Sequence, residues 1–210
     1  MKRILFIVML PVALHASWND NQAFESAMAQ AVSNKEELMS TTFTNQLARF
    51  IQSSTNVNDQ ATATLILAIS MAVSFEQTLD QALYFGSRNL ATNITGFATL
   101  PENSWQRSHS DLLLAGSYAM DNKYLPAYNI LTNSLRVINQ PGYTDPTNTV
   151  LTAINNYIYE MPDLTIQQIL SLYAGFSIAE LGNPVAARAL VAHLPLKYRQ
   201  MVEEIISGNP

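Results

Sequence analysis

Apolar residues recur along this chain at intervals of three and four positions, and no long stretch alternates with a period of two. The first spacing places apolar side chains on one face of a helix, whereas the second would indicate a strand. Leu38, Phe43 and Leu47, continued by Phe50 and Ile51, form one such helical stripe. The pattern therefore predicts an all-α fold of antiparallel helical hairpins.

The periodic segments divide the chain into helices separated by a few turn signals. Helices are predicted over residues 21–32, within 34–54, over 60–73, within 75–90, and over 105–121, 125–138, 147–159, 166–181, 185–194 and 197–206. Three Ser or Thr residues followed three positions later by Glu or Gln predict capping boxes at helix starts, namely Ser33–Glu36, Ser74–Gln77 and Thr165–Gln168. Asp145-Pro146 predicts a further start, and Gly182-Asn183-Pro184 a helix end.

Two of the predicted helices differ in how much of their surface is apolar. Residues 60–73 carry no charge, which is typical of a helix buried among others, so we expect this one to be central. In the next helix the expected buried stripe is Leu79, Ala82, Leu83 and Phe85, and Gly86 is expected to end or kink it.

The helical periodicity lapses at residues 93–103, where Gly96 and Pro101 interrupt the chain. The apolar residues Phe97 and Leu100 indicate a loop that packs against the helices, with the segments on either side in contact. We therefore predict a single all-helical domain over 17–210, with two packed halves (17–95 and 104–210) as the alternative.

The amino-terminal residues have the order of a secretory signal peptide. Lys2 and Arg3 precede an apolar run that ends at Leu14, and the small residues Ala16 and Ser17 follow. The run is shorter than the ~20 residues that span a bilayer. The sequence therefore predicts a signal peptide over 1–16, no integral membrane span after its cleavage, and a periplasmic or secreted protein.

Charge and cysteine content exclude several classes of partner and site. The formal net charge is −5, and loss of Lys2 and Arg3 would make it two units more negative, which disfavours nucleic acid. The absence of cysteine excludes disulfides and thiolate metal sites. Charged residues make up 13% of the chain, against ~25% in typical soluble domains. The surface is therefore either neutral and polar or covered in an assembly.

Two segments share a spacing of small and large apolar residues. The first holds Leu114, Ala115, Tyr118, Asn122, Tyr124, Ala127, Leu131, Ser134 and Pro141, and the second holds Ala174, Gly175, Ile178, Gly182, Ala187, Val191 and Leu194. Small residues let two helices approach closely, while Tyr and Leu fill the gap to the next hairpin. Both segments resemble tetratricopeptide repeats (TPR), although any antiparallel helix pair needs small residues where it crosses.

The resemblance implies a TPR-like α-α superhelix, with an irregular helical bundle as the alternative, and a protein-binding scaffold with a concave face. The partner-binding candidates on that face are His109, Leu112, Ile169, Leu172 and Phe176. Being mostly apolar, they would suit a helix or an extended segment of a partner. The alternative is that they are core residues covered by the neighbouring helix.

Catalytic chemistry has few candidates in this sequence. The run Ser108-His109-Ser110-Asp111 cannot form a catalytic triad within a helix, because adjacent positions point in different directions. Glu160 and Asp163 are among the scattered carboxylates from which a glycosidase pair could form. The sequence predicts no catalytic residue, metal site or cofactor.

The predicted function is that of an exported, non-enzymatic scaffold or adaptor that binds other proteins in a bacterial envelope complex. Two alternatives remain open. One is a cell-wall-active hydrolase of the lytic type, which needs titratable groups that converge in a pocket. The other is a binder of an apolar small molecule, which needs a cavity between helices.

Overall fold

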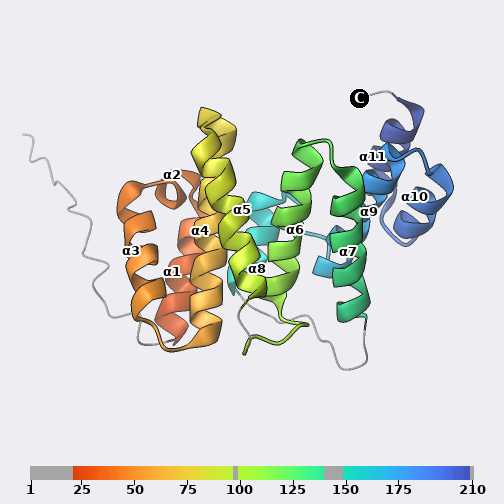
Figure 1. The fold of residues 1–210 in the computed structure, drawn as a ribbon. Coiled ribbons are helices and arrows are strands. Elements are labelled where there is room, and N and C mark those ends of the chain that lie inside the picture. Colours follow the sequence, from red (N-terminus) through yellow and green to blue (C-terminus); the bar gives the residue numbers. More distant parts are fainter. Residues whose placement is uncertain (1–20, 97–98, 140–148, 209–210) are drawn as a thin grey trace, which may run out of the picture.

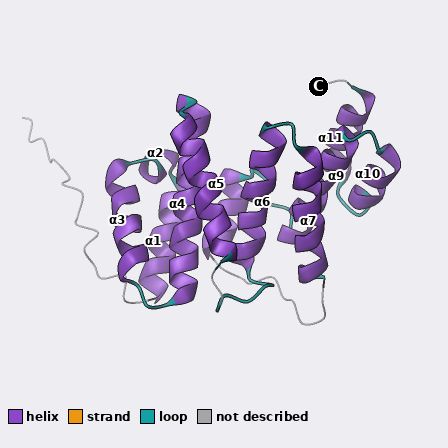
Figure 2. Ribbon diagram, viewed as in Figure 1, coloured by secondary structure: helices purple, strands orange, loops and turns teal. Residues whose placement is uncertain are grey.

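The computed structural model describes residues 21–96, 99–139 and 149–208. These residues form helices and contain no strand, so the all-α prediction is confirmed for the described part of the chain (Figure 2). The helices are α1 Asn21–Ser33, α2 Lys35–Leu38, α3 Thr41–Ser53, α4 Val57–Thr78, α5 Gln81–Thr95, α6 Trp105–Met120, α7 Tyr124–Ile138, α8 Thr149–Ala153, the π-helix η1 Ile154–Ile158, α9 Ile166–Glu180, α10 Pro184–Val191 and α11 Leu196–Ser207. The predicted signal peptide, Phe97 and Asp145-Pro146 lie outside the described residues.

The helices stand side by side in a row that follows the chain for most of its length (Figure 1). α3 packs on α4, α4 on α5, α5 on α6 and α6 on α7, and α9 continues the row with α10 and α11. The segment α8–η1 departs from this order, because it returns along the row to pack against α1.

The apolar side chains form two cores along the row. The first is built around α4 and α1, and the second around α9. Residues on both sides of the 96–104 loop share the first core, since Val150 and Ile154 from α8–η1 and Trp105 from α6 belong to it. Leu100 is buried in the loop itself, as expected.

The longest helix, α4, occupies the central position expected for residues 60–73. All ten residues from 61 to 70 are buried, in keeping with their lack of charge. In the described part of the chain, α4 is the helix that is long and apolar enough to cross a membrane, but 67% of its apolar window is buried inside the protein. Its composition is thus accounted for by burial among α1, α3, α5 and α6.

The stretch 34–54 breaks into two helices, which corrects the capping box predicted at Ser33. Ser33 is the last residue of α1, and its Oγ donates a hydrogen bond to the Ala29 carbonyl over 2.7 Å. Asn34 caps α2 and Ser40 caps α3 through their side-chain oxygens. Because two good N-cap residues lie six positions apart, the backbone can restart a helix at each.

The start of α5 also differs from the prediction, and this changes which face is buried. Ser74 lies inside α4, and Asp80 provides the cap of α5 by accepting from the Ala82 amide. The predicted stripe is therefore wrong, because Leu79, Ala82 and Phe85 are exposed. The buried positions of α5 are instead Tyr84, Ser87, Ala91 and Ile94.

Two glycines allow close helix crossings. α5 continues through Gly86 to Thr95, so this residue neither ends nor visibly interrupts the helix. A Cβ at Gly86 would lie 2.8 Å from Met71 Sδ on α4, and one at Gly175 would lie 2.7 Å from Val191 Cγ1 on α10. Because these glycines have no side chain, α5 can pack closely on α4, and α9 can pack closely on α10.

The turns that close α6–α7 and α9–α10 have the same geometry. Asn122 and Gly182, sixty positions apart, both adopt left-handed backbone conformations, with φ of 58° and 77°. The amide of Asn122 donates to the Ala119 carbonyl over 2.9 Å, and that of Gly182 to Ala179 over 2.8 Å. The helix end predicted at Gly182 and the capping box predicted at Thr165–Gln168 are both present.

Candidate functional site

The five predicted partner-binding residues lie mostly in the interior. His109, Leu112, Ile169 and Leu172 are between 0 and 5% exposed, and Phe176 is half-buried against the second core. Four of the five therefore belong to the core, which was the alternative interpretation. The sequence could not show this, because the cover comes from neighbouring helices and, over His109, from the segment that follows α8.

His109 lies between two aromatic rings, beneath the end of η1. Its ring centroid is 5.7 Å from those of Trp105 and Tyr159, and Nδ1 lies 2.9 Å from the Trp105 carbonyl oxygen. Burial lowers the pKa of His109 to about 4, against the opposing influence of Trp105 and Asn155. His109 Nε2 and Asn155 Oδ1 lack a hydrogen-bond partner among the described residues. The buried imidazole is therefore a neutral ring at pH 7.

A cavity of about 200 Å³ lies beside this cluster, among α4, α5, α6, η1 and α9. Its wall is mainly apolar and contains four aromatic rings and one carboxylate. The lining consists of Ile69, Ala72, Val73, Phe75, Glu76, Tyr84, Ser87, Leu112, Leu113, Gly116, Ser117, Met120, Ile158, Tyr159 and Tyr173. Of the five predicted partner-binding residues, the lining contains Leu112.

A hydrogen-bond network fixes one wall of this cavity. The hydroxyl of Tyr84 lies 2.6 Å from the Ser117 carbonyl oxygen and 2.9 Å from Asp121 Oδ1. Arg88 donates to the other oxygen of Asp121 over 3.1 Å and lies over the ring of Tyr118. These contacts hold the start of α5 against the end of α6, so the Tyr84 ring has a fixed place in the wall.

The opposite wall carries two tyrosines in unusual surroundings. The hydroxyl of Tyr159 is buried and has no hydrogen-bond partner among the described residues, and burial raises its pKa. Burial also raises the pKa of Tyr173, and the negative charge of Glu76 raises it further. Both phenols are therefore neutral at pH 7, and the Glu76 carboxylate lies within electrostatic reach of Tyr173.

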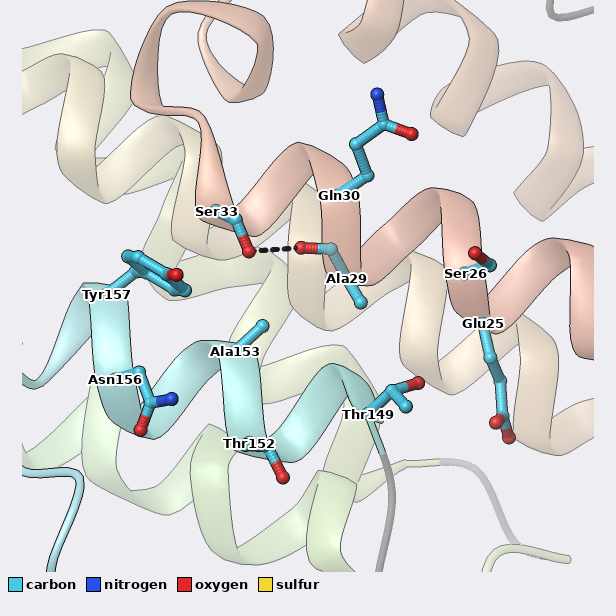
Figure 3. A pocket seen from close by; sticks show the side chains of 10 residues that line it. All are labelled: Glu25, Ser26, Ala29, Gln30, Ser33, Thr149, Thr152, Ala153, Asn156 and Tyr157. Atoms are coloured by element: carbon cyan, nitrogen blue, oxygen red, sulfur yellow. Dashed lines mark hydrogen bonds between the residues drawn. The ribbon is translucent and has the colours of Figure 1, made fainter.

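A second hollow is a wide, shallow groove of about 600 Å³ between α1 and α8–η1 (Figure 3). Its sides are lined from α1 by Glu25, Ser26, Ala29, Gln30 and Ser33, and from α8–η1 by Thr149, Thr152, Ala153, Asn156 and Tyr157. The hydrogen bond from Ser33 to the Ala29 carbonyl closes within α1 and does not cross the groove. This groove marks the seam where the returning segment meets the first core.

Several large apolar side chains are exposed near the hairpin turns. They are Leu79 and Phe85 at the α4–α5 turn, Met120 and Leu125 at the α6–α7 turn, and Leu181 and Val185 at the α9–α10 turn. The first two turns lie at the same end of the molecule, at the top in Figure 1. The sequence pattern predicted Leu79 and Phe85 to be buried and gave no signal for this exposed group.

Glu160 and Asp163, the candidate catalytic carboxylates of a hydrolase, do not line the cavity. Glu160 is largely exposed, with its nearest cation, Lys35 Nζ, at 3.8 Å. Asp163 accepts from the Tyr198 hydroxyl over 2.7 Å and pairs with Lys197, and these contacts lower its pKa. Within the described ranges, no group of His, Asp and Glu residues is arranged to hold a metal ion.

Comparison with protein-family models, with curated proteins and with solved structures found no match to this chain.

Proposed function

We propose that this protein is a non-enzymatic helical scaffold or adaptor that binds another protein and, after export, serves as a subunit or accessory of a bacterial envelope complex. The contact surface proposed is the end of the molecule where the α4–α5 and α6–α7 turns lie (Figure 1), and it includes Leu79 of the α4–α5 turn. The buried groove residues of the sequence analysis are not part of it.

The conformation and exposure of Leu79 carry this proposal. Leu79 has a φ of 58° and is 71% exposed. A left-handed backbone is costly for a residue with a large side chain, and the two corresponding turns use Asn122 and Gly182, which tolerate it better. Because the Leu79 side chain is exposed, its burial contributes little free energy that could offset this backbone cost. Strained residues of this kind persist where they serve an interaction.

The surroundings of Leu79 give it the properties of a binding surface. Phe85 and Met120 are also exposed, on helices that Tyr84 and Asp121 tie together by hydrogen bonds. A rigid apolar surface loses little conformational entropy on binding, which favours affinity. Large apolar side chains at the centre of an interface provide most of its binding energy.

The test is mild crosslinking in the native envelope. The proteins recovered with the wild type are then compared with those recovered with each single variant. Leu79→Asn copies the corresponding residue Asn122 and keeps the turn. We expect Leu79→Asn and Phe85→Ser each to lower recovery of a specific partner by about tenfold, the effect of losing a central apolar contact.

Val185→Ser is the matched control, because Val185 is 76% exposed on a different hairpin. It should leave recovery of that partner unchanged. An identical set of proteins at unchanged amounts from all variants, with the fold retained by circular dichroism, would refute this surface.

A further inference from the structure

The cavity among α4, α5, α6, η1 and α9 has an aromatic wall on several sides. Four aromatic residues line it: Phe75 from α4, Tyr84 from α5, Tyr173 from α9, and Tyr159, which directly follows η1. The rings of Phe75 and Tyr84 are 5.3 Å apart and tilted by 46°. Faces of aromatic rings carry negative electrostatic potential, and rings grouped around a cavity attract organic cations.

The charge around the cavity also favours a cation. Glu76 is the charged residue among those that line the cavity, and no Lys, Arg or His is in the lining. Burial raises the pKa of Tyr173 in the cavity wall, and the negative charge of Glu76 raises it further. An anion would meet this carboxylate without a compensating cation, whereas a cation would be attracted by both the carboxylate and the rings.

The size of the cavity limits the ligand. Its volume of about 200 Å³ equals that of roughly seven water molecules in the liquid, taking ~30 Å³ for each. Gly116 contributes to this space, since a Cβ built there would meet no atom within 4 Å. The space suits a compact ammonium group with a short arm, and it excludes a long lipid chain.

We propose that this cavity binds a small organic cation, a substituted ammonium. The ammonium lies among Phe75, Tyr84 and Tyr173 with Glu76 as its counter-charge. This site is separate from the surface around Leu79, and its binding does not depend on a protein partner.

The test is calorimetric titration of the purified protein with choline and with 3,3-dimethylbutan-1-ol, which has the same shape without the charge. We expect choline to bind roughly tenfold more tightly, as cation–π and carboxylate attraction together predict. Equal affinity for the two probes would overturn the proposal in favour of a neutral apolar site, and no binding of either would overturn it altogether.

Two variants assign the binding to this cavity. Glu76→Gln should lower choline affinity by roughly fivefold or more while leaving the neutral probe unchanged, whereas Glu204→Gln on α11 should change neither. Gly116→Leu should fill the space and abolish binding of both probes, with the fold checked by circular dichroism. Choline binding that is unaffected by both Glu76→Gln and Gly116→Leu would place the ligand elsewhere.

Discussion

His109 and Asp111 lie two positions apart on α6, and burial moves their pKa values in opposite directions. The pKa of His109 falls to about 4, whereas that of Asp111 rises to about 6 despite Ser134 and Arg107. In each case burial disfavours the charged form, which is the protonated imidazole for His109 and the carboxylate for Asp111. Their effects on stability therefore oppose each other between about pH 6 and pH 4.

The sign of each effect follows from proton binding in the folded and unfolded states. From about pH 6.5 to 4 the unfolded chain protonates His109 first, so acidification lowers the free energy of unfolding, by up to about 3 kcal/mol. The folded state protonates Asp111 first, so acidification from about pH 6 raises that free energy. The gain is smaller, about 1–2 kcal/mol, because Asp111 is only partly buried.

Removing one of the two groups at a time by mutation should reveal how the other changes the free energy of unfolding with pH. Relative to wild type, Asp111→Asn should lose more stability between pH 6.5 and 4, and His109→Leu should lose less or gain. Urea unfolding at three pH values across this window measures the difference. Parallel pH profiles for all three proteins would show that neither group is buried as described.

The turn residue Leu79 makes a separate prediction about stability. Because its backbone is left-handed and its side chain exposed, Leu79→Gly should raise the free energy of unfolding by about 0.5–1 kcal/mol. The midpoint of urea denaturation measures this. The substitution would thus stabilise the isolated protein while weakening the proposed partner contact, and a destabilised variant would remove the argument that Leu79 is strained.

At the level of elements, two glycines inside helices serve different purposes. Gly175 lies where α9 crosses α10, whereas Gly116 on α6 faces open space in the cavity. Gly175→Ala should lower the free energy of unfolding by about 1–3 kcal/mol, since Val191 must move. Gly116→Ala should raise it by about 1 kcal/mol through helix propensity alone. Thermal unfolding of the two variants side by side checks the opposite signs, and equal effects would contradict the crossing geometry.

Local signals in the sequence located most of the helices. Thr165 with Gln168 and Gly182 with Pro184 act within one or two turns, so both ends of α9 and the start of α10 were predictable. The start of α5 was not, because Ser74 and Asp80 are both good caps. Only the packing of α4 against its neighbours decides between them. That shift of six positions reversed the predicted burial of Phe85.

The candidate site was less predictable than the helices that form it. The cavity brings Phe75 and Tyr84 of the α4–α5 hairpin together with Tyr159 and Tyr173, two pairs that a long stretch of chain separates. No spacing rule links such positions. The burial of His109 likewise depends on the return of η1 toward α6, a contact between distant segments. Sequence periodicity shows which face of a helix is apolar, but not which other element covers it.

For the molecule as a whole, the return of α8–η1 joins the two predicted halves. Val150, Leu151 and Ile154 fill the first core beside α1. A fragment of residues 17–95 would therefore lack side chains that its own core requires. We expect this fragment to show no cooperative thermal transition by circular dichroism, in contrast to the full protein. A sharp transition in the fragment would show that the first half folds alone.

The same return has a consequence for proteolysis. Pro101, Glu102 and Asn103 are exposed in the connection between α5 and α6, where a protease could cleave. Cleavage there would cut the backbone without parting the two pieces, because Val150 and Ile154 of the carboxyl-terminal piece remain enclosed by the amino-terminal one. The nicked protein would migrate as one particle under native conditions and as two bands once denatured.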